Sequence, residues 1–344
     1  MSRRGGIHSD EHAGFDRPGR RSRPRTKDRP DFSDAALATV ITVDRGRYRL
    51  RLDGASDEPG RGLVSATKAR SLSRSRVVVG DRVRVVGDLS GEEGTLARLV
   101  EVEERRTVLR RTADDDDPYE RPVVANADQL AIVTALADPP PRPGMIDRIL
   151  VAGFDAGLDA LLVLTKADLA SPDEIVAAYR PLDVPVLTTQ PGADLSDLRE
   201  RLAGRTTVFV GHSGVGKSTL VNALIPGLDR AVGAVNATTG RGRHTSTSAI
   251  ALQLPALPDG RDGGWVIDTP GVRSFGLSHV TPDGIVSAFG DLAAETGSCP
   301  RGCRHDSTAV DCGLDQAVAE GRLSPERLQS FRRILDARLS AETY

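Results

Sequence analysis

Residues 211–220 read GHSGVGKSTL, and residues 211–218 match the pattern G-x-x-x-x-G-K-[ST] in full. A strand-like TTVFV precedes the match and a helix-like STLVNALI follows it, which is the context a phosphate-binding loop requires. Glycines let backbone N–H groups turn toward phosphate oxygens, and the N-terminus of the following helix adds a favourable dipole. The loop therefore predicts a nucleotide site in an α/β domain. The residues expected to bind the nucleotide are Gly211, His212, Ser213, Gly214, Val215, Gly216, Lys217, Ser218 and Thr219.

Two side chains of this loop have expected chemical roles. We expect Lys217 to reach the β- and γ-phosphates and to act in catalysis, and the Ser218 hydroxyl to ligate Mg²⁺. Fifty residues after Ser218, the strand-like GGWVI ends in DTPG. An aspartate at a strand end can hold Mg²⁺ through water, and a following glycine N–H can sense the γ-phosphate. DTPG alone is a common turn, but at this position Asp268 and Gly271 are the expected second element of the phosphate site.

A candidate base-recognition motif precedes the phosphate loop. Thr165, Lys166 and Asp168 lie in TKAD at the end of the strand-like LLVL. A carboxylate here can accept hydrogen bonds from N1–H and the N2 amine of guanine, a donor pair that adenine lacks. The guanine-binding pattern is usually Asn-Lys-x-Asp, and Thr165 stands in place of its asparagine. Thr188 and Thr189 in PVLTT are further candidates for contact with the base.

The order of the motifs is unusual. In ordinary small GTPases the base motif follows the phosphate loop, whereas here the order is TKAD, GHSGVGKST, DTPG. This order predicts a circular permutation of the GTPase domain. The site survives the rewiring because its loops all leave the carboxyl ends of parallel strands.

Composition limits the class of protein. The chain has 344 residues, 39% hydrophobic and 27% charged, and no continuous apolar run long enough to span a bilayer. We expect a cytoplasmic monomer that does not associate with a membrane. Residues 1–30 hold nine Lys or Arg against four Asp or Glu, whereas the whole chain has a formal charge of −2. This basic arm is expected to be disordered, and either a solubilising tail or a nucleic-acid-binding arm.

The chain divides into regions of different pattern. Short strands with glycine turns, among them a hairpin turning at Arg45-Gly46 in ATVITVDRGRYRLRL, predict a small β-barrel. The acidic ADDDDPYERP at 113–122 predicts a linker, after which alternating strands and helices predict a parallel sheet covered on both faces. The predicted domains are a disordered tail (1–34), an OB-fold-like barrel (35–110), a circularly permuted P-loop GTPase domain (111–280) and a zinc-binding helical domain (281–344).

Arginines gather in two places. Several crowd the predicted barrel, and they indicate either contact with RNA or a solvated charged face. The same alternatives apply to the last helix, expected after an N-cap at Ser324 and a first helical residue at Pro325. The arginines concerned are Arg70, Arg74, Arg76, Arg82 and Arg84 in the barrel, and Arg327, Arg332, Arg333 and Arg338 near the C-terminus.

All three cysteines lie between residues 299 and 312. Their number is odd and they are clustered, which favours a metal site over a disulfide framework. Cys299, Cys303, His305 and Cys312 give the spacing C-x₃-C-x-H-x₆-C. Three thiolates and one imidazole suit a closed tetrahedral zinc site, so one structural Zn²⁺ is expected.

The motif order, with a barrel before it and a Cys/His cluster after it, resembles the ribosome small-subunit-dependent GTPase A family. NADQLAIV, IDRILV, LTKADL, GRGRHTSTSAIAL, VIDTPGVRSFGL and CPRGCRHDSTAVDC carry the resemblance, over roughly residues 35–340. It implies a GTPase that binds GTP with Mg²⁺, acts late in the assembly of the small (30S) ribosomal subunit and is stimulated by it. It also implies that the barrel and the zinc domain contact ribosomal RNA and that hydrolysis favours release.

Turnover needs a group to position water. Val272 follows DTPG, where many GTPases carry a glutamine, and valine cannot form that hydrogen bond. His244 in GRGRHTSTS is the candidate, and the alternative is that it is a solvated loop histidine. Thr245 or Thr247 is expected to close on Mg²⁺. Two other classes stay open: a nucleotide-dependent RNA-binding module with negligible turnover, and a P-loop ATPase or kinase.

Overall fold

The computed structural model describes residues 31–55, 61–73, 75–111, 121–228, 249–269 and 280–340. Residues 1–34 and 35–344 form separate units, and almost all of the first, including the basic arm, lies outside the described residues. Over the described part of the chain, no helix combines the length and apolar character needed to cross a membrane.

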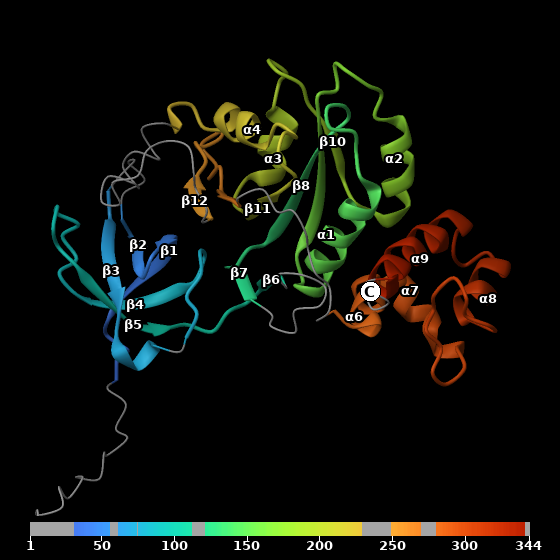
Figure 1. The fold of residues 1–344 in the computed structure, drawn as a ribbon, viewed down its shortest axis with the longest axis horizontal. Helices are drawn as coiled ribbons and strands as arrows, with labels where there is room; N and C mark the ends of the chain where they lie inside the picture. The colour runs from blue at the N-terminus through green and yellow to red at the C-terminus, as the bar shows by residue number, and fades with distance from the viewer. Residues whose placement is uncertain are drawn as a thin grey trace, which may run out of the picture. The chain divides into compact units, whose positions relative to one another are not determined.

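The first five strands form a closed barrel (Figure 1). Their order is β1-β2-β3-β5-β4, and β1 pairs with β4 to close the ring. The strands are β1 (Ala36–Asp44), β2 (Arg47–Leu52), β3 (Leu63–Lys68), β4 (Arg82–Gly87) and β5 (Ala97–Val102), with a 3₁₀ turn η1 (Arg70–Leu72) after β3. Arg45 and Gly46 both have positive φ, 44° and 83°, so the predicted hairpin turn is confirmed.

The outward-facing arginines of β4 form ion pairs within the barrel. Arg82 pairs with Asp53, and Arg84 lies 2.6 Å from a carboxylate oxygen of Glu103. These partners neutralise the β4 face, so of the two readings for Arg82 and Arg84 the structure favours the solvated charged face. The side chain of Arg74 lies outside the described residues.

A two-stranded ribbon follows the barrel. β6 (Val108–Arg111) pairs antiparallel with β7 (Arg121–Ala125). The predicted linker at 113–122 is therefore wrong for its last two residues, Arg121 and Pro122, which belong to β7. Pro122 is tolerated there because a two-stranded ribbon consists of edge strands.

The other six strands of the same hydrogen-bonded sheet are mostly parallel and lie in the order β10-β9-β8-β11-β13-β12. Among them only β12 runs antiparallel to its neighbour, and it also pairs with β1 of the barrel at Ile250 and Thr42. The strands are β8 (Gln129–Ala135), β9 (Asp159–Thr165), β10 (Val186–Thr188), β11 (Thr206–Val210), β12 (Ile250–Gln253) and β13 (Trp265–Asp268). Every residue of β8 is buried, as expected for a strand covered on both faces.

Alternate residues of these strands enter two different cores. In β8, Leu130 and Ile132 pack in one core with residues of α1, while Ala131 and Val133 pack in the other with residues of α3 and α4. The two-residue period of a strand causes this division. The helices of this domain are α1 (Pro143–Asp155), α2 (Asp173–Tyr179) with the 3₁₀ turn η2 (Arg180–Leu182), α3 (Ser196–Leu202) and α4 (Lys217–Leu224). The predicted doubly covered sheet is confirmed.

The C-terminal region is helical. The two helices predicted after the cysteine cluster are present, and Arg327 N–H donates to Ser324 Oγ at 3.1 Å, which confirms the N-cap. The helices before the cluster were not predicted. The elements are α6 (Pro282–Ala288), α7 (Gly290–Glu295), the 3₁₀ turn η3 (Thr296–Ser298), α8 (Gly313–Ala319) and α9 (Pro325–Ser340).

Helix α9 is anchored on α1 and α2 by a buried polar group. Asp147 of α1 is 2% exposed and accepts from Arg333 Nε at 3.0 Å and from the Tyr179 hydroxyl at 2.8 Å. The Arg333 guanidinium lies 4.8 Å from the centre of the Tyr179 ring. Burial raises the pKa of Asp147, and the charge of Arg333 opposes that rise. Arg333, one of the arginines predicted to be solvated or to bind RNA, therefore has a structural role.

Two further arginines of α9 have carboxylate partners. Arg327 contacts both carboxylate oxygens of Asp291 at 2.9 Å, and Arg332 contacts both of Asp315 at 2.7 Å. RNA contact through Arg327, Arg332 or Arg333 would have to compete with these pairs. The side chain of Arg338 lies outside the described residues.

Replacing Arg333 with alanine should destabilise the protein in a pH-dependent way. The variant leaves the buried Asp147 carboxylate without its counter-charge, which costs about 3 kcal/mol at neutral pH. Without Arg333 the folded-state pKa of Asp147 rises further above its unfolded value. The protonated form needs no cation, so the penalty should be smallest at acid pH and grow as pH rises through the folded pKa. Urea unfolding of the variant and the parent at matched pH values measures it.

The control for this prediction is Arg322→Ala. Arg322 pairs with Glu295 and Glu320 while 41% of its side chain is exposed, so its loss should cost about 1 kcal/mol or less. Equal penalties for the two variants, or a penalty for Arg333→Ala that is independent of pH, would contradict the role assigned to Asp147.

Candidate functional site

Three loops with the predicted motifs leave the same edge of the parallel sheet. β11 runs into the loop 211–216, β9 ends at Thr165, and β13 ends at Asp268. Because these strands are parallel, their carboxyl ends and the loops that follow them meet at one edge. The reversed order along the chain therefore does not separate the motifs in space.

Backbone geometry explains the glycines of the phosphate loop. Gly214 and Gly216 have φ values of 85° and 86°, a backbone conformation that residues with a side chain rarely adopt. A Cβ at Gly211 would lie 2.4 Å from the carbonyl oxygen of Val133, so only glycine fits. Val215 is buried, whereas Ser213, Ser218 and Thr219 are exposed. The loop thus presents its polar residues outward from an apolar base.

Lys217 lies between the phosphate loop and the end of β13. Its side chain is 9% exposed, and its Nζ donates to Asp268 Oδ1 and, at 2.6 Å, to the carbonyl oxygen of Thr269. The Thr269 hydroxyl in turn donates to the carbonyl of Phe209 at 2.8 Å, which holds the end of β13 against β11. The predicted phosphate lysine and the predicted magnesium aspartate are therefore direct neighbours.

Thr165 connects the base motif to the phosphate loop. Its hydroxyl lies 2.5 Å from the carbonyl oxygen of Val215 and 3.3 Å from that of Thr134. Thr165 is 5% exposed, so these buried carbonyls have no easy access to water. A hydroxyl is thus sufficient to bridge the two motifs in this chain.

The other residues of the base motif are held in place by contacts that were not predicted from the sequence. Lys166 has φ 57°, and its Nζ donates to the carbonyl of Asp138 in the loop after β8. The N–H of Ala167 donates to the carbonyl of Thr189 at 3.1 Å, which ties the motif to the end of β10. Asp168 is exposed and thus accessible to a ligand. Only Thr189 had a sequence signal, its place in PVLTT.

A small pocket lies beside the phosphate loop. Pro139, Pro140 and Arg142 line it from the loop after β8, together with His212 and Val215. The His212 Nδ1 lies 2.9 Å from the carbonyl oxygen of Ser213. Three predicted site residues, Gly271, His244 and Thr245, lie outside the described residues, as do Thr247 and Val272.

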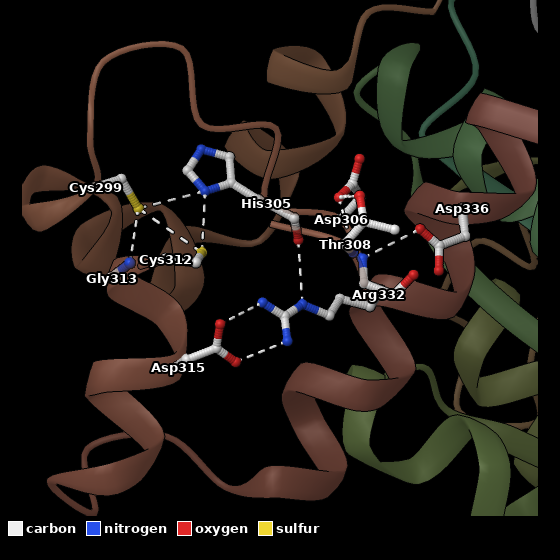
Figure 2. Close-up of polar contacts among 10 residues, drawn as sticks. Cys299, His305, Asp306, Thr308, Cys312, Gly313, Asp315, Arg332 and Asp336 are labelled. Atoms are coloured by element: carbon white, nitrogen blue, oxygen red, sulfur yellow. Dashed lines mark hydrogen bonds and ion pairs between the residues drawn. The ribbon is translucent and has the colours of Figure 1, made fainter. Parts of the chain in front are cut away.

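The four predicted metal ligands come together in the C-terminal region. Figure 2 shows Cys299, His305 and Cys312 beside one another. The ligand atoms of Cys299, Cys303, His305 and Cys312 all lie within 4.8 Å of one another and could hold a metal ion. Cys299 Sγ is 3.5 Å from His305 Nδ1 and 3.9 Å from Cys312 Sγ, and Cys312 Sγ is 3.6 Å from His305 Nδ1. The imidazole thus presents Nδ1 to the thiols.

Neighbouring groups hold the cluster in shape. The N–H of Gly313 donates to Cys299 Sγ at 3.1 Å, and Arg332 lies between Asp315 and the carbonyl oxygen of His305 (Figure 2). Burial and the neighbouring thiols raise the pKa of Cys299 to about 11, and the Gly313 N–H opposes the rise. A bound cation would favour the thiolate that these surroundings otherwise disfavour.

The fold and the order of the loops define a circularly permuted P-loop GTPase domain. Over residues 102–278 the chain matches the family described as RsgA GTPase. The crystal structure of YloQ, described as a circularly permuted GTPase, superposes with a TM-score of 0.61 at 23% identity, covering 89% of this chain and 96% of that one. This likeness concerns the fold.

Two curated relatives carry the name small ribosomal subunit biogenesis GTPase RsgA. One, from Ectopseudomonas mendocina, is 43% identical over 62% of this chain, and the match spans 63% of the relative's length. The other, from Alcanivorax borkumensis, is 38% identical over 86% of this chain and 83% of its own length. The chain belongs to the RsgA GTPase family.

Replacing Thr165 with valine should weaken nucleotide binding. Valine keeps the shape but removes the hydroxyl that donates to the buried carbonyl of Val215, at a cost of about 1–3 kcal/mol. We expect the dissociation constants for GDP and GTP to rise together by about tenfold. Titration with a fluorescent guanine nucleotide measures the change. Thr165→Ser, which keeps the hydroxyl, should bind as the parent does. A Thr165→Val variant with unchanged affinity would contradict the bridging role.

Proposed function

We propose that this chain is a GTP hydrolase that acts in late maturation of the small (30S) ribosomal subunit, binds its ribosomal RNA and is released on hydrolysis. The observation that carries the proposal is the contact between Thr165 and Val215, which joins the base motif to the phosphate loop. The names of the curated relatives support the ribosomal part. The proposed partners are GTP or GDP and the small subunit, and the proposed setting is a cytoplasmic monomer.

The nucleotide is held by groups with separate tasks. Asp168 accepts from the guanine edge, and Lys166 and Thr165 fix the loop that carries it. The N–H groups of residues 211–219 surround the phosphates, and Lys217 places a cation beside the β- and γ-phosphates. Ser218, Asp268 and Thr245 would hold Mg²⁺, which neutralises charge that develops on the phosphate oxygens. The closeness of Lys217 to Asp268 supports this assignment.

Hydrolysis needs a positioned water, which His244 is proposed to provide. An imidazole nitrogen can accept a proton from water, whereas the Val272 side chain has no acceptor. His244 belongs to a segment rich in polar residues, GRGRHTSTS. A histidine that acts only after ribosome binding accounts for slow intrinsic turnover and a large stimulation by the subunit.

A short tether connects the phosphate site to the metal-binding region. Asp268 ends β13, and α6 begins at Pro282, so few residues separate the two along the chain. Gly271 lies within this tether. A change at the γ-phosphate therefore reaches the C-terminal helices through a covalent path, which gives hydrolysis a route to alter ribosome binding.

The metal is proposed to be one structural Zn²⁺. With Zn–S near 2.3 Å and Zn–N near 2.0–2.1 Å, tetrahedral edges are about 3.8 Å for S···S and about 3.6 Å for S···N. Among Cys299, His305 and Cys312 the distances are 3.9 Å for S···S, and 3.5 and 3.6 Å for S···N; the Cys303 ligand atom lies within 4.8 Å of the other three. Three thiols and an imidazole leave no open position, so the role is structural.

Turnover of GTP and ATP, each with and without purified small subunits, tests the proposed function. We expect GTP hydrolysis to rise at least tenfold with subunits and ATP hydrolysis to stay at background. His244→Ala should bind GTP nearly as the parent does and lose at least tenfold of the stimulated rate. Phosphate release that subunits do not change would favour the RNA-binding module with negligible turnover. ATP turnover equal to GTP turnover would favour an ATPase.

Metal analysis of protein purified without chelators should find about one zinc per chain. Cys303→Ser and His305→Ala each remove one of four ligands and should lower zinc content well below one and reduce the cooperativity of unfolding. Ser307→Ala, in the same loop but without a ligand atom, should keep its zinc. Parent protein without zinc would overturn the assignment.

A further inference from the structure

A cavity lies at the edge of the parallel sheet that is opposite the nucleotide site. Its volume is about 530 Å³, and residues from the starts of β8 and β9, the segment before β10 and the end of α3 line it. The nucleotide loops follow the carboxyl ends of the same strands. Because β9 has seven residues, about 20 Å separate the cavity from the base motif. The cavity is therefore a separate site, with the volume of one for a small organic molecule.

A buried amide that lacks one hydrogen-bond partner lines this cavity. Gln129 begins β8 and is 4% exposed, and its Oε1 accepts from the Thr207 hydroxyl at 3.2 Å. Over the residues that the structure describes, its Nε2 has no hydrogen-bond acceptor. Nε2 keeps part of the small exposed area of the residue, so it is reached from the cavity. A ligand that supplies an acceptor at this point would satisfy an otherwise costly buried donor.

The charged groups around the cavity leave one positive charge without a partner. The three carboxylates each have an arginine within 3.2 Å, and the pairs are Asp159 with Arg205, Glu200 with Arg261, and Asp183 with Arg327. Arg201, in the last turn of α3, also lines the cavity and is exposed. In the described part of the chain no carboxylate pairs with Arg201. The cavity thus favours an anion over a cation.

The remaining lining is largely apolar and well fixed. Phe154, Leu158 and Leu182 contribute apolar side chains. The Phe154 ring packs edge to face on Phe289, with 4.9 Å between ring centres, which holds its orientation. The carbonyls at the end of α1 are already occupied, because Gly157 N–H donates to Phe154 at 3.0 Å and Leu158 N–H donates to the turn before it. They therefore repel an anion less than free carbonyls would.

We propose that this cavity binds a small organic carboxylate that carries an apolar group. The carboxylate accepts from the Arg201 guanidinium and from Gln129 Nε2, and the apolar group packs on Phe154. The planar fork of a guanidinium matches the two oxygens of a carboxylate. A single unpaired cation among paired carboxylates suits one negative charge better than the two charges of a phosphate monoester. The inference goes beyond the proposed function, and it does not depend on GTP hydrolysis or on the ribosomal subunit.

Titration of phenylacetate into the full chain, followed by saturation-transfer difference NMR, tests the proposal. Phenylacetamide has the same ring without the charge, and phenyl phosphate has the same ring with a second charge. For a ligand of this size we expect a dissociation constant of about 1 mM for phenylacetate. Phenylacetamide and phenyl phosphate should each bind at least fivefold more weakly. Saturating GDP should leave the binding of phenylacetate unchanged, because the two sites are separate.

Three variants identify the residues that bind the carboxylate. Arg201→Ala should weaken phenylacetate binding at least fivefold, and Gln129→Met, which keeps the length of the side chain but has no N–H, should weaken it at least threefold. The matched control is Arg98→Ala on β5 of the barrel. Arg98 is exposed and, like Arg201, has no ion pair among the described residues. Its loss removes the same charge away from the cavity and should change affinity less than twofold.

Several outcomes overturn the proposal. They are the absence of saturable phenylacetate binding to the parent, equal binding of phenylacetate and phenylacetamide, tighter binding of phenyl phosphate, and displacement of phenylacetate by GDP. Equal effects of Arg201→Ala and Arg98→Ala would also contradict it, and a folded Gln129→Met with unchanged affinity would remove the amide from the site. Thermal melts check folding. If Gln129→Met is unfolded, Arg201→Ala decides alone, since Arg201 is exposed. GTP turnover does not enter these measurements, so a failure of the proposed function leaves them interpretable.

Discussion

The hydrogen bond from the Thr165 hydroxyl to the Val215 carbonyl joins the base motif to the phosphate loop. It joins two loops that are fifty residues apart in sequence and reversed in order relative to ordinary GTPases. The contact is possible because β9, β8 and β11 are parallel neighbours, so their carboxyl ends lie at one edge. Chain order matters little to such a site, since only strand direction and strand order determine which loops meet.

The same edge places opposite charges close together. Lys217 and Asp268 contact each other while the lysine is nearly buried, so each offsets the cost of burying the other. In the proposed function, a nucleotide with Mg²⁺ would offer both groups stronger partners, namely phosphate oxygens for the lysine and a cation for the aspartate. Exchange of one set of pairings for the other would then link nucleotide binding to the end of β13. The tether to α6 begins there, so the phosphate site and the metal-binding region are linked by the chain itself.

Local patterns predicted most of this architecture. The phosphate loop, the barrel hairpin at Arg45-Gly46 and the Cys/His cluster each depend on residues close in sequence, and the permuted order follows from the order of motifs that are themselves local. The missed contacts depend on partners far apart: Arg333 and Asp147 are 186 residues apart, and Lys166 and Asp138 are 28 apart. Asp147 resembles an ordinary polar residue within IDRIL, and nothing local indicates that it becomes buried. The predicted linker was wrong at Arg121 and Pro122 because β7 gains its stability from pairing with β6, not from its own sequence.

The arginines of this chain differ in whether a carboxylate already forms an ion pair with them, and this difference affects how well each can bind phosphate. By sequence, Arg82, Arg84, Arg327 and Arg333 are as suitable for RNA as Arg47 or Arg98. An arginine already bound to a carboxylate must lose that partner to bind phosphate, and the net gain in free energy is small. An exposed, unpaired arginine gains the whole interaction together with the release of counterions. The distinction is invisible in composition, since it depends on which carboxylates the fold brings near. Helix α9 uses Arg333 and Arg327 to attach to α1 and η2 of the GTPase domain, whereas Arg47 and Arg98 of the barrel are exposed and, over the residues that the structure describes, lie in no ion pair.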